Sequence, residues 1–179
     1  MKSTLILLPF AAVLASCGTV SDVKPVAGTA SKTFSNVVVR DFKYQGAADE
    51  SRGPASALNF SNLVSSEISG QGVFRSVARS GRANSNTLVV DGEVTRFVEG
   101  NVALRAIVGL GAGSSYFDAN VRFIDGGTGA VLGTMSADKN SWVLGGGLAA
   151  GQTVESFMNG AAKKVGEESV KFAKATAQP

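Results

Sequence analysis

The segment from Tyr116 to Met135 constrains the fold more than any other part of the chain, because it has the pattern of two strands joined by a tight turn. Apolar and polar residues alternate through 116–125, which is the period of a strand with one buried and one solvated face. The turn sequence DGGTG follows at 125–129, and a second strand is expected over 130–135. The segment therefore predicts an antiparallel hairpin.

Five further elements are expected in the rest of the chain. Runs of β-branched or alternating residues predict strands over 36–42, 73–77 and 87–97, and apolar residues at helical spacing predict helices over 54–69 and 153–175. In this order the elements predict an α+β fold. The expected layout is a mainly antiparallel sheet of four to five strands with two helices on one face.

Each predicted helix has one apolar stripe, which we expect to face the sheet. In the first helix the stripe consists of Ala57, Phe60, Val64 and Ile68. In the second it consists of Val154, Met158, Ala161, Val165 and Phe172. Charged residues of the second helix lie four apart and are expected to pair on its exposed side, namely Lys163, Lys164, Glu167, Glu168 and Lys171.

The amino terminus has the pattern of a cleaved export signal. Lys2 precedes an apolar stretch that ends at Leu14 and is too short to span a bilayer. Leu14-Ala15-Ser16-Cys17 then matches the lipobox of bacterial lipoproteins, in which small residues fit the lipoprotein signal peptidase and the cysteine sulfur accepts a diacylglyceryl group. Cleavage before Cys17 frees an amine for a third acyl chain, and two or three chains give stable anchoring in a membrane.

General secretory cleavage after Ala15 is the alternative, and it would leave a soluble periplasmic protein with a free thiol. Cys17 is the single cysteine, so no disulfide is expected in either case. Gly18 rather than an aspartate follows Cys17, which favours an outer-membrane lipoprotein facing the periplasm. The expected organisation is a signal peptide at 1–16, a lipidated cysteine and flexible tether at 17–35, and a single α+β domain at 36–175.

The absence of histidine excludes several kinds of site. Ser-His-Asp and Cys-His devices need a histidine, and a metal site would have to be built from carboxylates alone. The net charge of +3 comes from scattered Lys and Arg rather than from a basic run. We therefore expect no nucleic-acid partner, no metal and no cofactor.

Two apolar, glycine-rich segments at 102–115 and 142–151 match neither the dinucleotide fingerprint nor the P-loop. Two interpretations stay open for them. Glycine allows unusual backbone or tight packing beneath the helices, or the segments contact a partner chain or the bilayer. The candidate contact residues are Gly109, Leu110, Gly111, Gly113, Leu144, Gly145, Gly146 and Gly147.

Hydrolysis by a pair of carboxylates is the remaining catalytic hypothesis, and its candidates are Asp41, Asp91, Asp118 and Asp125. Asp125 already has a role in the hairpin turn, and the other three are expected to be solvent-facing residues of strands. We therefore expect a protein that is not an enzyme.

Three groups of residues carry a resemblance to a known family: Val37-Val38-Val39-Arg40-Asp41-Phe42, the segment 100–105 with 109–114, and Phe123-Ile124-Asp125 with Thr128-Gly129. From about Asn36 to Phe172 the chain resembles the bacterial lipoproteins of domain of unknown function 4410 (DUF4410). This resemblance implies no catalytic residues. It implies a layout similar to the TolB amino-terminal domain and to domains of the curli-secretion pore, which mediate protein contacts in the periplasm.

The leading hypothesis is a membrane-anchored envelope binding or assembly module. Its expected partners are the membrane, through the lipid on Cys17, and a periplasmic protein or further copies of itself. An oligomeric component of an export or pore assembly is the alternative, with the glycine-rich segments as subunit or bilayer contacts.

Overall fold

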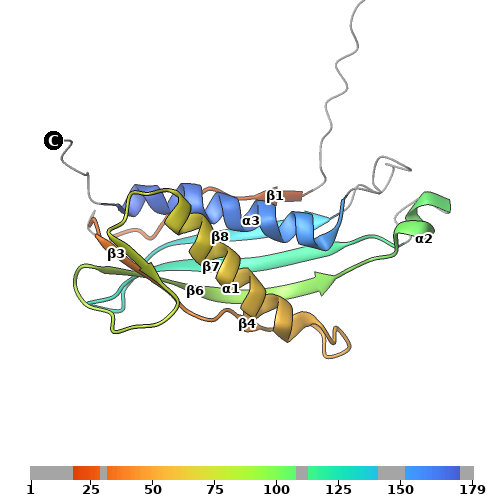
Figure 1. Ribbon diagram of the computed structural model, residues 1–179, viewed down its shortest axis with the longest axis horizontal. Helices are drawn as coiled ribbons and strands as arrows, with labels where there is room; N and C mark the ends of the chain where they lie inside the picture. Colours follow the sequence, from red (N-terminus) through yellow and green to blue (C-terminus); the bar gives the residue numbers. More distant parts are fainter. Residues whose placement is uncertain (1–17, 29–31, 108–112, 141–151, 174–179) are drawn as a thin grey trace, which may run out of the picture.

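The computed structural model describes residues 18–28, 32–107, 113–140 and 152–173, which form one mixed sheet with two long helices on one of its faces (Figure 1). The strands in these residues are β1 (Gly18–Val20), β2 (Lys24–Pro25), β3 (Asn36–Val39), β4 (Lys43–Tyr44), β5 (Ser76–Ala78), β6 (Thr87–Val98), β7 (Tyr116–Asp125) and β8 (Val131–Asn140). The helices are α1 (Gly53–Gly70), α2 (Val102–Ile107), α3 (Val154–Ser169) and the 3-10 turn η2 (Val170–Phe172). The predicted α+β class is thereby confirmed.

The predicted hairpin is present as β7 and β8 and lies at the centre of the sheet. Its turn is held by Asp125, whose Oδ1 accepts a hydrogen bond from Gly127 N at 2.8 Å and whose carbonyl accepts one from Gly129 N at 2.7 Å. Burial alone would raise the pKa of Asp125, but hydrogen bonds from Lys32 and Gly127 lower it. The carboxylate is therefore charged where the turn needs an acceptor.

The sheet differs from the prediction of four to five mainly antiparallel strands. It has eight strands in the described residues, in the order β1-β8-β7-β6-β3-β5, with β2 also on β8 and β4 also on β6. β3 pairs in parallel with both β5 and β6. The reason is that α1 returns the chain to the end of the sheet at which β3 began, so β5 runs in the same direction as β3.

The apolar stripe predicted for α1 forms the centre of the core. Its four residues are each at most 1% exposed. Phe60 meets the rings of Phe42 and Phe117 edge-on, with ring centroids 5.0 Å apart in each pair. A Cβ at Gly92 of β6 would lie 2.7 Å from the Phe42 ring, so the glycine makes room for that ring above the sheet.

The second long helix begins at Val154, after Thr153, whose side chain accepts a hydrogen bond from Ser156 N at 3.2 Å. Val154, Met158, Ala161 and Val165 are buried as predicted. The helix ends at Ser169 and continues as η2 to Phe172, whereas the prediction extended to 175. In the described part of the chain, no helix is both long and apolar enough to cross a bilayer.

Residues 18–25, predicted as part of a flexible tether, form the outermost strands on β8. β1 pairs antiparallel with the end of β8, where Gly18 lies opposite Lys139, and β2 pairs with it further along. Val23, between the two strands, is buried. Phe34, at the far end of the expected tether, is fully buried as well. The described residues of 18–35 are therefore part of the fold.

A buried carboxylate holds this amino-terminal segment in place. Glu168 of α3 accepts a hydrogen bond from Val23 N at 2.8 Å and ion pairs with Lys171 at 2.5 Å and Lys164 at 3.2 Å. Lys164 also reaches Asp22 at 2.7 Å. The predicted pairing of Lys164 with Glu168 is present, but Glu168 is 6% exposed rather than on the open side of the helix. The reason is that the chain between β1 and β2, at Asp22 and Val23, lies against it.

Burial alone would raise the pKa of Glu168, but hydrogen bonds from Lys171, Val23 N and Lys164 outweigh it and lower the pKa from 4.5 to about 2. Each pH unit between these values corresponds to about 1.36 kcal/mol of differential interaction. The charged carboxylate therefore contributes on the order of 3 kcal/mol to folding at neutral pH.

We expect Glu168→Gln to lower the free energy of unfolding by about 2–3 kcal/mol at neutral pH, because two lysines and the Val23 amide lose a charged acceptor. Because the folded pKa lies below the unfolded one, the stabilisation is complete above about pH 5 and is lost as the pH falls from 4.5 toward about 2. Urea denaturation across this range measures the gap between variant and natural chain.

Glu167→Gln is the matched control, since Glu167 lies next to Glu168 on α3 and is exposed. It makes the same change of charge and should alter stability by less than about 0.5 kcal/mol. Equal effects of the two variants, or a gap for Glu168→Gln that does not close in acid, would contradict the role given to Glu168.

Candidate functional site

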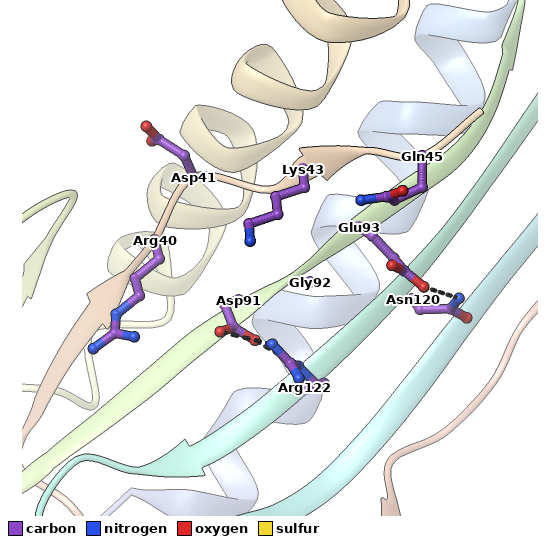
Figure 2. A pocket seen from close by; sticks show the side chains of 9 residues that line it. All are labelled: Arg40, Asp41, Lys43, Gln45, Asp91, Gly92, Glu93, Asn120 and Arg122. Atoms are coloured by element: carbon purple, nitrogen blue, oxygen red, sulfur yellow. Dashed lines mark hydrogen bonds and ion pairs between the residues drawn. The ribbon is translucent and has the colours of Figure 1, made fainter. Parts of the chain in front are cut away.

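The face of the sheet opposite α1 and α3 carries a hollow of about 420 Å³, which we call the polar hollow (Figure 2). It lies over β6 and β7 and beside the chain that connects β3 to β4. Its lining residues are polar or charged apart from one glycine: Arg40, Asp41, Lys43, Gln45, Asp91, Gly92, Glu93, Asn120 and Arg122.

Strand alternation places the floor of the polar hollow. Val90 and Val94 of β6 are buried, so Asp91 and Glu93 between them face the other side. On β7 the register sets Arg122 opposite Asp91 and Asn120 opposite Glu93. Two hydrogen bonds of 2.8 and 3.0 Å join Arg122 to the Asp91 carboxylate, and Asn120 donates one of 3.1 Å to Glu93.

The rim of the hollow comes from the segment that follows β3. Phe42 turns inward to the core, and its amide donates a hydrogen bond of 2.8 Å to Ser61 Oγ of α1. Asp41 points away from β6 in Figure 2 and ion pairs with Arg79 at 2.5 Å. Arg79 also donates to Val39 O at 2.6 Å, so the bend after β3 is fixed from outside the hollow.

Two cations of the rim are left available. Within the described residues, the side chains of Arg40 and Lys43 have no hydrogen bond or ion pair, whereas Asp41, Asp91 and Glu93 each have a partner. Lys43 extends from β4 toward β6 in Figure 2. The hollow therefore suits the binding of an anionic or hydrogen-bonding group of a partner by its rim cations.

A pair of aspartates lies further along the same face. Asp118 of β7 stands directly opposite Asp138 of β8, and on its other side it faces Arg96 of β6. Burial and the charge of Asp138 raise the pKa of Asp118, against the lowering effect of Arg96 and the Lys139 amide. Asp118 Oδ1 and Asn140 Oδ1 are buried without a hydrogen-bond partner among the described residues. Like charges opposite each other destabilise a sheet.

Most of the site residues predicted from the sequence lie outside the described residues. These are Leu14, Ala15, Ser16 and Cys17 of the lipobox, and Gly109, Leu110, Gly111, Leu144, Gly145, Gly146 and Gly147 of the glycine-rich segments. Gly113 is described, with φ +71° and its carbonyl accepting a hydrogen bond of 2.8 Å from Asn101 N. A Cβ there would lie 2.5 Å from Asn101 O, so at this position glycine serves tight backbone packing.

The four aspartates considered for hydrolysis are held in separate environments. Asp41 pairs with Arg79, Asp91 with Arg122 and Asp125 with Lys32, while Asp118 faces Asp138. No group of three or more acidic or cysteine side chains in the part of the chain that the structure describes is arranged to hold a metal ion. Asp41, Asp91 and Asp125 are thus each paired with a cation, whereas Asp118 faces a second carboxylate.

Sequence reasoning missed the polar hollow as a site. Asp91 was considered only for hydrolysis or as a solvent-facing strand residue, Arg122 only as a strand residue, and Lys43 was not considered. Alternation along both strands was the available signal, because it puts Asp91, Glu93, Asn120 and Arg122 on one face. The position of Lys43 depends on the pairing of β4 with β6, for which two residues of strand give no pattern.

We expect Asp118→Asn to raise the free energy of unfolding by about 0.5 kcal/mol at neutral pH, because it removes the repulsion from Asp138. Since the folded pKa of Asp118 is raised, the gain should vanish as the pH falls through that pKa and the carboxyl becomes neutral in both states. Asp91→Asn is the control and should have the opposite sign, because Asp91 pairs with Arg122. Thermal unfolding at neutral and acid pH measures both; a loss of stability for Asp118→Asn at neutral pH would contradict the assignment.

Comparison with solved structures shows what the fold resembles. PelC from Paraburkholderia phytofirmans, a dodecamer solved in two crystal forms, superposes with TM-scores of 0.57 and 0.56 at 15% identity, covering 88% of this chain and 99% of PelC. The protein XCC0632 from Xanthomonas campestris gives a TM-score of 0.48 at 15% identity, covering 82% of this chain and 90% of that protein. At these identities the likeness to PelC concerns the fold alone.

No curated protein matches the sequence. Residues 32–145 do match the family described as domain of unknown function (DUF4410). This span contains β3 to β8 and every residue of the polar hollow. It also contains both residues of the Lys32–Asp125 ion pair. This match confirms the resemblance noted in the sequence, and the chain belongs to the DUF4410 family.

Proposed function

We propose that the protein is a bacterial lipoprotein, anchored in the outer membrane by acyl chains on Cys17, that serves as a non-catalytic binding module on the periplasmic side. The observation that carries the proposal is the sequence Leu14-Ala15-Ser16-Cys17 directly before β1. A lipidated residue 17 would be the first residue of the mature chain, and the fold begins at the next one. Anchor and binding domain would then be continuous.

The polar hollow supports the binding part of the proposal. Its carboxylates are engaged with Arg79, Arg122 and Asn120, so Arg40 and Lys43 are the groups available to a partner. A partner with surface carboxylates suits this arrangement, since arginine and lysine bind carboxylates by charge-assisted hydrogen bonds. A TolB-like layout, as in periplasmic domains that mediate protein contacts, would fit the same role.

The anchor is tested by growing cells with a fatty-acid probe and comparing the natural chain with Cys17→Ala. We expect label on the natural chain, no label on the variant, and recovery of the labelled protein with the outer membrane. The physical reason is that two or three acyl chains hold a protein in a bilayer where an unmodified thiol does not. An unlabelled natural chain in the soluble periplasmic fraction would contradict the anchor and favour cleavage after Ala15.

Self-association is a second candidate function, favoured by the likeness to PelC. That protein forms a dodecamer, and this chain covers 99% of it. We propose that copies of this chain assemble side by side in the membrane as part of an export or pore assembly. A ring of lipid-anchored copies would multiply the weak contact that each domain makes.

Size-exclusion chromatography with light scattering tests the assembly. We expect the detergent-solubilised lipoprotein to elute as one discrete oligomer larger than a dimer, since closed symmetric assemblies have a fixed number of subunits. The chain from Gly18 onward, made without lipid, is the control, because it separates assembly by the folded domain from copies that merely share a micelle. A monomer in both preparations would contradict self-association.

A further inference from the structure

The short helix α2 carries the most exposed large apolar side chain of the described residues. Ile107 is 84% exposed and Leu104 46% exposed, whereas the other exposed large apolar residues, Val26, Leu58 and Val170, are 39–48% exposed. Burial of an aliphatic side chain that is this open to solvent is favourable.

Hydrogen bonds hold the start of α2 at the end of the sheet. Asn101 N donates to Gly113 O at 2.8 Å, and Asn101 Oδ1 accepts from Leu104 N at 3.0 Å. Ser115 Oγ donates to Glu99 O at 2.6 Å, which joins the end of β6 to the start of β7. In Figure 1 the helix projects beyond the sheet, with neither long helix over it. Its apolar residues are thus exposed on a helix whose start is fixed to the sheet.

The first described residue lies at the same end of the sheet. Gly18 is opposite Lys139, next to the end of β8, and Asn140 is opposite Tyr116, the first residue of β7. Tyr116 is in turn opposite Val98, the last residue of β6, from which the chain runs into α2. Figure 1 shows the start of β1 and α2 toward the same end of the molecule.

We propose that this end of the domain rests on the membrane surface, with Leu104 and Ile107 in the interface between lipid headgroups and acyl chains. This inference rests on the proposed lipidation of Cys17. One residue of chain spans at most about 3.6 Å, so acyl chains on residue 17 leave no slack between bilayer and β1. The pairing of β1 with β8 and the hydrogen bond from Val23 N to Glu168 keep residues 18–23 on the domain, so they cannot act as a longer tether.

The bilayer is the occupant that fits because it must already lie at this end. Apolar side chains on a short helix at the interface add their own burial to that of the acyl chains. Glu99, just before α2, is also ion paired, with Arg52. The long strands would therefore extend away from the membrane surface, and α2 would be the part of the domain that contacts it.

Site-directed fluorescence on the full lipoprotein tests this orientation. Ile107→Cys is purified from outer membranes, labelled with an environment-sensitive dye and reconstituted into phosphatidylethanolamine and phosphatidylglycerol vesicles that contain a nitroxide-labelled phospholipid. Val170→Cys is the matched control, since Val170 is exposed on η2 at the other end of the fold. The dye must react only at the introduced cysteine, so Cys17 has to be blocked by its lipid. The natural chain is treated with the same dye to check that Cys17 does not react.

We expect a blue-shifted emission and several-fold stronger nitroxide quenching at 107 than at 170. Equal quenching at the two positions, with Cys17 unreactive and its lipid confirmed by mass spectrometry, would overturn the orientation while leaving the anchor intact. Dye on the natural chain at an unmodified Cys17 would overturn the anchor and the orientation together. A blue shift at 107 with no stronger nitroxide quenching than at 170 would assign this surface to a second copy and overturn the bilayer as its occupant.

Discussion

The hydrogen bond between the Val23 amide and the Glu168 carboxylate is the contact on which the arrangement of the amino terminus depends. It joins residues 145 positions apart and brings the first strands of the fold onto the last helix. Apart from it, β1 and β2 have five residues of backbone pairing on one edge of the sheet, with two further backbone hydrogen bonds from Ser21 N and Val26 N. Two-residue and three-residue strands are too short to hold by themselves, so a charged acceptor inside α3 completes them.

The elements that sequence patterns predicted are those whose residues show a clear period of their own. The β7–β8 hairpin has its own turn, and the stripe of Ala57, Phe60, Val64 and Ile68 has a helical period that needs no knowledge of its partner. Boundaries shifted by a few residues, because helix ends respond to neighbours such as η2. The α+β class follows from these elements alone.

The parts that could not be predicted depend on distant partners. The parallel pairing of β3 with β6 depends on two returns of the chain, through α1 and through residues 79–86. The short strands β1 and β2 show no alternation that would predict them. Glu168 was assigned to the solvated side of its helix because nothing in the sequence indicated that Asp22 and Val23 pack against it. The polar hollow was hidden for a similar reason, since Asp91 and Arg122 become a site only where the segment around Lys43 crosses beside them.

If Cys17 is lipidated as proposed, the start of β1 at Gly18 also fixes an order of events in maturation. A signal peptidase binds an extended stretch of chain around the bond it cuts, and a folded domain offers none after residue 17, because Gly18, Thr19 and Val20 are hydrogen-bonded to β8. Acylation and cleavage would therefore precede the docking of β1. Until then the outer edge of β8 would have no strand beside it, so the newly exported chain would pass through a stage with an open sheet edge beside the membrane.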